Sequence, residues 1–323
     1  MNILNLEPEN YDRDTRALLE LAGTVTYHDA HADSPATGPF SAVCLKLGIM
    51  ADAPWMDNYP GLRYLLTPTT GLTHIDLDAA AARGIAVISL KGETAFLSTI
   101  TSTAEHTWAL LLALVRRLPA ALADVRAGNW QRHPFMATEL RGKTLGIVGC
   151  GRLGRIVAGY GRAFGMDVLV HDRDAAQAGA AGFVNTPLET LLGASDVVSL
   201  HIPYEPANRH MIDVERLAQM KPGALLINTA RGEVLDETAL LAALASGRLA
   251  GAALDVLDED SSWPQQSPVG HLLIEAAKTY PQLLITPHTG GYAREAITRT
   301  RRFIVEKFLA HTGLPIVHPF LSN

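Results

Sequence analysis

The chain has 323 residues, of which 48% are hydrophobic, and this composition suffices for two globular domains with cores of their own. A formal net charge of −6 without a basic block argues against nucleic acid as the main partner. No apolar run approaches the roughly 18 residues that span a membrane, and the polar, acidic start lacks the pattern of a signal peptide. The two cysteines, Cys44 and Cys150, have neither a metal-ligand spacing nor a disulfide pattern. We therefore expect a cytoplasmic protein with no membrane segment and no metal site.

The first hundred residues alternate short apolar runs with helical patterns. Strands are predicted at residues 3–6, 24–27, 42–45, 63–67 and 85–88, and helices at residues 13–22 and 77–83. Gly84 follows the second helix at the place of a C-cap glycine. These elements predict an α/β domain, and it carries no glycine fingerprint.

A longer helix is predicted at residues 103–118. Ser102 and Glu105 have the spacing of a capping box at its start, and Pro119 follows its end. The capping box explains Glu105, so we interpret this residue and its neighbour His106 as structural. The helix has a broad apolar face, which predicts that it is buried.

The second half of the chain again alternates strands and helices. Strands are predicted at residues 145–148, 167–170, 197–200, 224–228, 252–256 and 283–286. Their apolar runs lack a polar alternate face, which is typical of a parallel sheet covered on both sides. A last helix, at residues 293–309, is expected to return to the first domain. This predicts one domain of residues 1–101 together with 290–323, and a second domain of residues 102–289 inserted within it.

The inserted domain opens with a G-x-G-x-x-G pattern at residues 149–154, between a strand and a helix. Gly149 permits the tight turn, Gly151 lets the backbone approach a pyrophosphate, and Gly154 lets helix and strand pack closely. The N-terminus of the helix at residues 155–164 offers free N–H groups and partial positive charge to phosphates. The pattern therefore predicts a dinucleotide site.

An acid stands about 20 residues beyond this pattern, where such folds contact the ribose of the nucleotide. Asp172 is predicted to accept hydrogen bonds from the ribose hydroxyls and to repel a 2′-phosphate, which favours NAD over NADP. Arg173 beside it weakens this preference, because an arginine can pair with that phosphate.

Polar residues follow three later strands of the inserted domain: Arg231, the acidic turn at residues 258–260, and His288. The carboxyl ends of strands line the ligand crevice of a doubly wound sheet. An arginine binds a substrate carboxylate, and a histidine exchanges a proton near neutral pH. A carboxylate behind the imidazole orients it and favours its charged form. This set predicts hydride exchange with a 2-hydroxy or 2-keto acid.

With these motifs the chain resembles the D-isomer-specific 2-hydroxyacid dehydrogenase family. The resemblance covers most of the chain and includes residues 70–76, 104–106, 149–154, 200–203, 228–232, 254–256 and 286–288. It implies two Rossmann-like, doubly wound parallel-sheet domains, with the NAD-binding one inserted in the substrate-binding one. It also implies NAD as cofactor, a small 2-hydroxy or 2-keto acid as substrate, and a homodimer that buries the helix at residues 103–118 and residues 121–130.

The resemblance implies a role for each matching residue. Arg231 matches the substrate-binding arginine, His288 the catalytic acid/base, and Asp260 the acid that partners the histidine. The family usually has glutamate at that place, so Asp260 is a departure, and Glu259 remains open as an alternative. Asp255 matches the residue that contacts the nicotinamide carboxamide.

Further contacts are implied for the cofactor and the substrate. The cofactor positions are Gly149, Gly151, Arg152, Leu153, Gly154, Asp172, Thr103, His201, Pro203, Thr229 and Ala230. Thr70 and Gly71 match the backbone amides that hold the substrate carboxylate. Lys91 and Gly92 lie where the family carries its substrate loop, and they offer charge and N–H groups to an anion, although a plain surface lysine is an equal alternative.

Two other kinds of function remain open. One is a hydrolase that uses tightly bound NAD, as the S-adenosylhomocysteine hydrolases do, but its substrate-domain residues are not found here. The other is a co-repressor that senses NADH. A sensor has no need for Arg231, Asp260 and His288 together, so the complete set argues for an enzyme.

Overall fold

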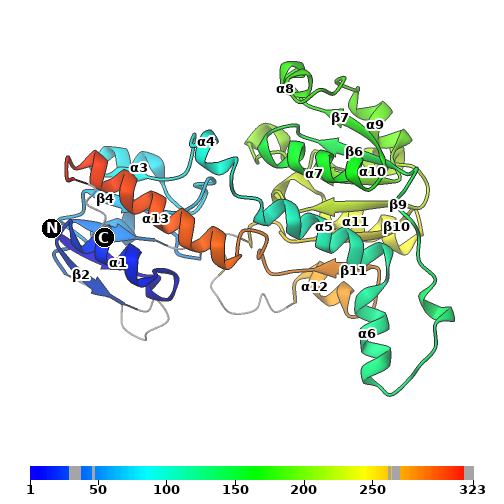
Figure 1. Cartoon of the computed structure of the whole chain (residues 1–323), viewed down its shortest axis with the longest axis horizontal. Coiled ribbons are helices and arrows are strands. Elements are labelled where there is room, and N and C mark those ends of the chain that lie inside the picture. Colours follow the sequence, from blue (N-terminus) through cyan, green and yellow to red (C-terminus); the bar gives the residue numbers. More distant parts are fainter. Residues whose placement is uncertain (29–37, 46–47, 261–262, 264–269, 316–323) are drawn as a thin grey trace, which may run out of the picture. The chain divides into compact units, whose positions relative to one another are not determined.

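The computed structural model describes residues 1–28, 38–45, 48–260, 263 and 270–315 (Figure 1). The chain forms two compact units, and each is an α/β structure built on one parallel sheet. Residues 1–99 and 293–315 lie in the first unit, and residues 100–260 and 270–292 lie in the second. Two parallel-sheet units, one of them inserted in the other, confirm the predicted fold class.

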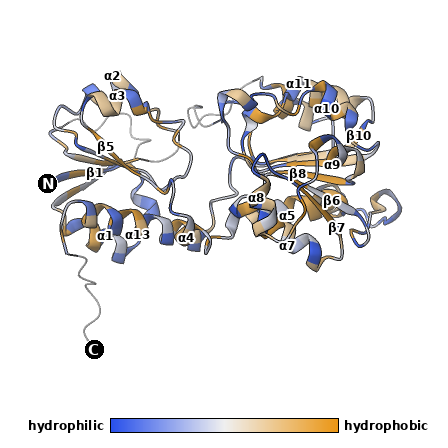
Figure 2. Cartoon of the chain, turned by 90° about the horizontal axis from the view of Figure 1, so that it is seen from above, coloured by the Kyte–Doolittle hydropathy of each residue, from blue (hydrophilic) through white to orange (hydrophobic). Residues whose placement is uncertain are grey.

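The first unit has a five-stranded sheet of order β2-β1-β3-β4-β5. The strands are β1 (Asn2–Asn5), β2 (Thr24–Tyr27), β3 (Ala42–Cys44), β4 (Tyr64–Leu66) and β5 (Ala86–Ile88). The helices are η1 (Pro8–Asn10), α1 (Arg13–Glu20), α2 (Ala53–Asp57), α3 (Leu77–Ala82), α4 (Thr94–Leu97) and α13 (Arg294–His311). Figure 2 shows α1 and α13 on one face of this sheet and α2 and α3 on the other. Each face buries its own apolar cluster.

The second unit has a six-stranded sheet of order β11-β10-β9-β8-β6-β7. The strands are β6 (Thr144–Val148), β7 (Asp167–His171), β8 (Val197–Leu200), β9 (Ala224–Asn228), β10 (Leu249–Leu254) and β11 (Leu283–Ile285). The α-helices are α5 (Ser102–Val115), α6 (Leu118–Arg126), α7 (Arg152–Ala163), α8 (Ala175–Ala180), α9 (Leu188–Ala194), α10 (Val214–Gln219), α11 (Glu237–Ala245) and α12 (Leu272–Ala277). Three short 3-10 turns are η2 (His133–Phe135), η3 (Pro206–Asn208) and η4 (Gly232–Val234). α5 and α7 cover one face of the sheet, and α10 and α11 lie on the other (Figure 2).

The long helix of the second unit differs from its prediction at both ends. The predicted capping box is wrong, because the Ser102 hydroxyl donates to the carbonyl of Gly290 (2.6 Å) while Thr101 donates to Glu105 (2.5 Å). The helix ends at Val115, since Arg117 adopts a left-handed φ of +53°. Pro119 then stands in the first turn of α6, where its missing N–H costs nothing.

Other boundaries in the second unit also differ from their predictions, most of all those of α7 and β10. α7 begins at Arg152, three residues before the predicted start, so the last three residues of the fingerprint lie in the first helical turn. β10 runs from Leu249 to Leu254 rather than over residues 252–256, with an irregular register next to Gly251. Among the described residues, no helix is both long and apolar enough to cross a membrane.

Candidate active site

The turn between β6 and α7 is shaped by glycines that no other residue can replace without movement. Gly149 has a φ of +96°, and a Cβ added there would lie 2.6 Å from the carbonyl oxygen of His201. A Cβ at Gly154 would lie 1.9 Å from the carbonyl oxygen of Gly149. Gly149 thus lets the loop after β8 close over the turn, and Gly154 lets α7 pack against it.

The N-terminus of α7 is open. Gly151 is its N-cap residue, and among the described residues no side chain caps the helix there. A Cβ added at Gly151 would meet nothing within 4 Å. Free N–H groups at the positive end of a 12-residue helix suit a pyrophosphate, so the residues present fit a dinucleotide such as NAD.

The two residues after Gly151 turn their side chains away from this opening. The Arg152 guanidinium donates to the carbonyl of Ile100 (2.6 Å), and Leu153 packs against the apolar core of the second unit. Their contribution to a bound phosphate would come from backbone N–H groups.

Asp172 lies beside the turn, directly after β7. Its Oδ2 accepts the backbone N–H of Cys150 (2.7 Å), and its Oδ1 accepts that of Asp174 (2.9 Å). The carboxylate is therefore fixed next to the glycine turn. Arg173, the next residue, is exposed and forms two hydrogen bonds with Glu205.

The loop after β8 brings His201 and Pro203 toward the glycine turn. His201 Nε2 lies 2.9 Å from the Ser199 hydroxyl. Burial lowers the pKa of His201 to about 4, so this imidazole is neutral at pH 7. A neutral, hydrogen-bonded imidazole is suited to support the loop rather than to carry charge.

The turn after β9 is held by a buried asparagine that sequence reasoning did not single out. Asn228 Oδ1 accepts the N–H of Ala230 (3.0 Å), and its Nδ2 donates to the carbonyl of Arg231 (2.8 Å). The Thr229 hydroxyl lies 2.7 Å from that of Thr107 on α5. The Arg231 guanidinium donates to the carbonyl of Ala230 (2.6 Å). An asparagine at the end of an apolar strand was the available signal for this role.

The structure brings Asp260 to His288, with 2.9 Å between Oδ2 and Nδ1. Glu259 instead is exposed and lies 3.7 Å from Arg209. Glu259 and His288 both have a left-handed φ, of +60° and +53°. Such a conformation costs on the order of 1–3 kcal/mol in a residue other than glycine and is concentrated at functional sites.

The turns after β9 and β10 are in close contact. A Cβ added at Gly232, the residue after Arg231, would lie 2.0 Å from the carbonyl carbon of Leu257. Leu257 stands three residues before Asp260 and donates its N–H to that carboxylate (3.2 Å). Glycine at position 232 therefore lets the segment that carries Arg231 pack against the segment that carries Asp260.

Asp255 fixes the loop that carries His288. Its carboxylate accepts the Thr286 hydroxyl (2.6 Å), the N–H of Thr289 (2.9 Å) and the N–H of Gly290 (2.7 Å). Its backbone carbonyl accepts the N–H of His288 (2.8 Å). Burial raises the pKa of this carboxyl, but hydrogen bonds outweigh burial and leave it lowered. The contact of Asp255 with a nicotinamide carboxamide stays a prediction.

Helix α5 contributes two residues to the same loop. His106 Nε2 lies 3.2 Å from Asp255 Oδ1 and 2.9 Å from the Thr286 hydroxyl. Thr103 lies close to Gly290, where a Cβ would meet the Thr103 methyl group at 3.3 Å. His106, interpreted from the sequence as structural, thus supports the loop of His288.

The predicted substrate residues lie in the first unit, after β4 and β5. The carbonyl of Gly71 accepts the Thr69 hydroxyl (2.9 Å), which fixes the turn that contains Thr70. Lys91 and Gly92 are exposed, and Gly92 has a φ of +86°. These residues stand at the carboxyl end of their sheet, as the catalytic candidates do in the second unit.

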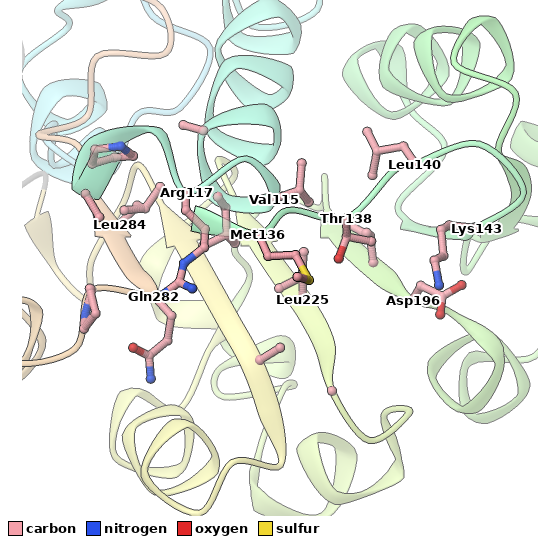
Figure 3. Close-up of a pocket in the computed structure, with 18 residues that line it drawn as sticks. Val115, Arg117, Met136, Thr138, Leu140, Lys143, Asp196, Leu225, Gln282 and Leu284 are labelled. Carbon is pink, nitrogen blue, oxygen red and sulfur yellow. The ribbon is translucent and has the colours of Figure 1, made fainter. Parts of the chain in front are cut away.

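The second unit also contains a cavity of about 440 Å³ (Figure 3). It is lined by the end of α5, residues 136–143 and the amino ends of β8 to β11, including Val115, Leu225 and Leu284. Because the catalytic candidates follow the carboxyl ends of the strands, this cavity is not part of the candidate site.

Comparisons with known proteins point to one family. Residues 108–290 match the family model described as D-isomer specific 2-hydroxyacid dehydrogenase, NAD binding domain. The D-3-phosphoglycerate dehydrogenase of Mycobacterium tuberculosis is 38% identical over 267 residues, which are 82% of this chain and 48% of that protein. The chain thus spans about half the length of the phosphoglycerate dehydrogenases that it matches.

Two further proteins match over more of their own length. The glyoxylate reductase of Aeropyrum pernix is 37% identical over 268 residues, which are 80% of this chain and 76% of that protein. A crystal structure of D-lactate dehydrogenase from Aquifex aeolicus, complexed with NAD and lactic acid, has a TM-score of 0.80 and 31% sequence identity. That match covers 97% of this chain and 96% of the other.

Proposed function

The chain belongs to the D-isomer specific 2-hydroxyacid dehydrogenase family, whose NAD-binding domain it contains, and on that premise we propose that it interconverts a D-2-hydroxy acid and its 2-keto acid. The second unit binds NAD and the first recognises the substrate. When bound, the nicotinamide gives or takes the hydride. The names of the relatives favour an oxidoreductase over an NADH-sensing co-repressor or a hydrolase.

The observation that best supports this proposal is the His288–Asp260 contact. Asp260 engages Nδ1, so Nε2 of His288 is the atom that exchanges a proton with the substrate oxygen. Asp260 orients the ring through this contact. Arg231 pairs with the substrate carboxylate through its fork of donors, which lysine does not reproduce.

The residues of the first unit keep their proposed role in substrate recognition. Backbone N–H groups at Thr70 and Gly71, together with Lys91 and Gly92, bind the anionic part of the substrate. Lys91 is exposed and Gly92 has the backbone freedom of a loop, which supports a role in recognition. Replacing Lys91 with methionine would then raise KM for the keto acid more than it lowers kcat.

The function is tested by measuring NADH oxidation with three 2-keto acids: glyoxylate, pyruvate and the oxidation product of 3-phosphoglycerate that carries a keto group at C2. At least one should be reduced to the D-hydroxy acid. His288→Asn should lower kcat about 10²- to 10⁴-fold, the usual contribution of a general acid, while NADH affinity measured by fluorescence stays within about threefold. Full activity of His288→Asn would contradict the proposal.

A second pair of variants tests which acid serves the histidine. Asp260→Asn should lower kcat roughly 10- to 100-fold, since an oriented imidazole loses its carboxylate partner. Glu259→Gln is the matched control and should stay within about twofold of the parent. If only Glu259→Gln lowers kcat, the acid is assigned one residue too late.

We propose in addition that the protein is a homodimer. α5 is largely buried within its own unit, whereas α6 and the residues after it expose large apolar side chains, namely Leu118, Leu122, Val125, Trp130 and Met136. Leu122→Glu combined with Trp130→Glu should shift the sedimentation mass from dimer to monomer. Val184→Glu, at another exposed apolar residue, should not; a monomeric parent protein would contradict this proposal.

A cytoplasmic location completes the proposal. Cys44 and Cys150 are buried free thiols, as expected in a reducing compartment. Protein whose accessible thiols are blocked at cell lysis should show two free thiols when denatured, and a disulfide-linked product would argue against this location.

A further inference from the structure

An ion pair spans the two strands that flank the glycine-turn strand. Arg173 follows Asp172 after β7, and Glu205 lies in the loop after β8. β6 pairs with both β7 and β8 and therefore lies between them in the sheet. The contact between Arg173 and Glu205 thus passes the carboxyl end of β6, where the glycine turn begins.

The geometry of this pair is that of two parallel hydrogen bonds. Arg173 Nη1 donates to Glu205 Oε2 (2.7 Å), and Nη2 donates to Oε1 (3.0 Å). The hydrogen bond to Glu205 raises the pKa of Arg173, and the same bond lowers the pKa of Glu205, so both stay charged at neutral pH. The pair uses the whole fork of donors that an arginine offers to a carboxylate or a phosphate.

The local fold determines the position of Glu205. Its backbone N–H donates to Asn208 Oδ1 (2.8 Å), and Asn208 Nδ2 donates to the carbonyl of Pro203 (2.8 Å). The backbone carbonyl of Glu205 accepts the N–H of Asn208 (2.9 Å) at the start of the short turn η3. The backbone at Glu205 is therefore fixed by the same loop that carries His201 and Pro203.

An unpaired Arg173 would favour the wrong cofactor. In dinucleotide-binding folds an acid at the position of Asp172 accepts the ribose hydroxyls, and an arginine nearby accommodates a 2′-phosphate. We propose that Glu205 determines cofactor specificity by pairing with Arg173 and withholding its guanidinium from the 2′-phosphate of NADP(H). This inference rests on the proposed function only in that a dinucleotide binds at the glycine turn.

The pair is not needed to hold the fold together. The side chains of Arg173 and Glu205 are 76% and 43% exposed, and ion pairs exposed to this degree contribute little to stability. Variants of either residue should therefore fold, and their effect on the cofactor can be measured directly.

The test is equilibrium binding of NADH and NADPH, followed by nicotinamide fluorescence, with turnover measured in parallel. The parent protein should bind NADH more tightly. Glu205→Gln should tighten NADPH binding roughly three- to tenfold, as a charge-assisted hydrogen bond becomes available, and change NADH binding less than twofold. Arg173→Gln combined with Glu205→Gln should lose that gain.

The matched control is Glu275→Gln, which breaks an exposed pair with Lys278 on α12, beside β11 at the other edge of the sheet. It should leave both affinities unchanged. An unchanged NADPH affinity in Glu205→Gln overturns the inference, as does a gain that persists in the double variant, because Glu205 would then act without Arg173. If the parent protein binds NADH normally, either of these two results leaves the proposed function intact. If the parent protein does not bind NADH at all, both the inference about Glu205 and the proposed function are wrong.

Discussion

The two units of the chain share a strand order but differ in the turn after the first strand. The first unit is ordered β2-β1-β3-β4-β5, and the second repeats this order as β7-β6-β8-β9-β10 with β11 added at the edge. In both, the first strand of the unit lies where the order of the strands reverses, which is where such sheets bind ligands. Strand order alone therefore does not explain why the second unit, which contains the residues matched by the NAD-binding family model, binds the nucleotide.

The difference lies at the helix N-terminus that follows that strand. In the first unit the Asp12 side chain caps α1 and accepts the N–H of Thr15 (2.8 Å), and the buried Glu7 adds a carboxylate at the end of β1. In the second unit the cap of α7 is Gly151, with open space beside it. In the first unit a carboxylate of the chain itself caps the helix, whereas in the second unit the N-terminus of the helix has no side-chain cap. From this difference we propose that the turn after the first strand, and not the strand order, lets the second unit bind a dinucleotide.

The largest effect is expected when the N-cap residue of α7 is changed to aspartate, the residue that caps α1 in the first unit. Gly151→Asp places a carboxylate at the N-terminus of α7, in an extended conformation that aspartate adopts freely. NADH affinity should fall by about 100-fold or more, because the new carboxylate competes with the phosphates and repels them. The melting temperature should hold or rise, as expected for a good N-cap. Gly151→Ser provides the uncharged control, and NADH affinity unchanged in Gly151→Asp would remove the basis of the contrast.

A smaller effect is a pH dependence of folding stability that comes from His201 in the second unit. The folded-state pKa of His201, about 4, lies below its ordinary value of 6.5, so the unfolded chain takes up the proton first as the pH falls. The stability contributed by this group is complete above pH 6.5 and is lost as the pH falls toward 4. At pH 5 the loss amounts to about 2 kcal/mol. Urea unfolding of the cofactor-free protein at pH 7.5 and 5 should show that His201→Asn loses less stability than the parent. If the parent and His201→Asn lose the same stability between pH 7.5 and 5, the lowered pKa of His201 does not account for the loss.

The smallest effect is expected when the side-chain cap of α1 in the first unit is removed. Asp12→Ala removes the cap of α1 and should cost about 1 kcal/mol of unfolding free energy, with NADH affinity unchanged. Asp14→Ala, in the same turn but without the capping bond, should cost less than about 0.5 kcal/mol. A change in NADH affinity in Asp12→Ala would show that the two helix ends are not independent.

The elements with strong local signals were predicted from the sequence. β2, β8 and β9 have the predicted bounds, because each is a compact β-branched or apolar run, and β6 begins one residue before its prediction. The end of α5 was missed, since a left-handed arginine such as Arg117 has no signature in the sequence. The capping box failed because Ser102 bonds to Gly290, far along the chain.

In the candidate site, too, some features could be predicted from the sequence and others could not. The glycine turn and the three polar strand ends could be read from spacing and from the family resemblance. The choice between Asp260 and Glu259 could not, because it depends on the turn that brings one of the two carboxylates to His288. The Asp255–His106 and Arg173–Glu205 contacts join residues distant in sequence, and no local pattern encodes such pairs.

The return of α13 to the first unit has a consequence for how the protein is made. Phe308 and Val305 of this helix are fully buried, the helix packs against α1, β4 and β5, and Arg301 forms a 2.7 Å ion pair with the buried Glu7. The ribosome therefore synthesises the whole inserted unit before it synthesises α13, which completes the apolar core of the first unit. Because domains fold as units during synthesis, we expect the first unit to complete its fold after the inserted unit, and a ribosome stalled before residue 294 would leave one face of the first sheet covered by α1 but not by α13.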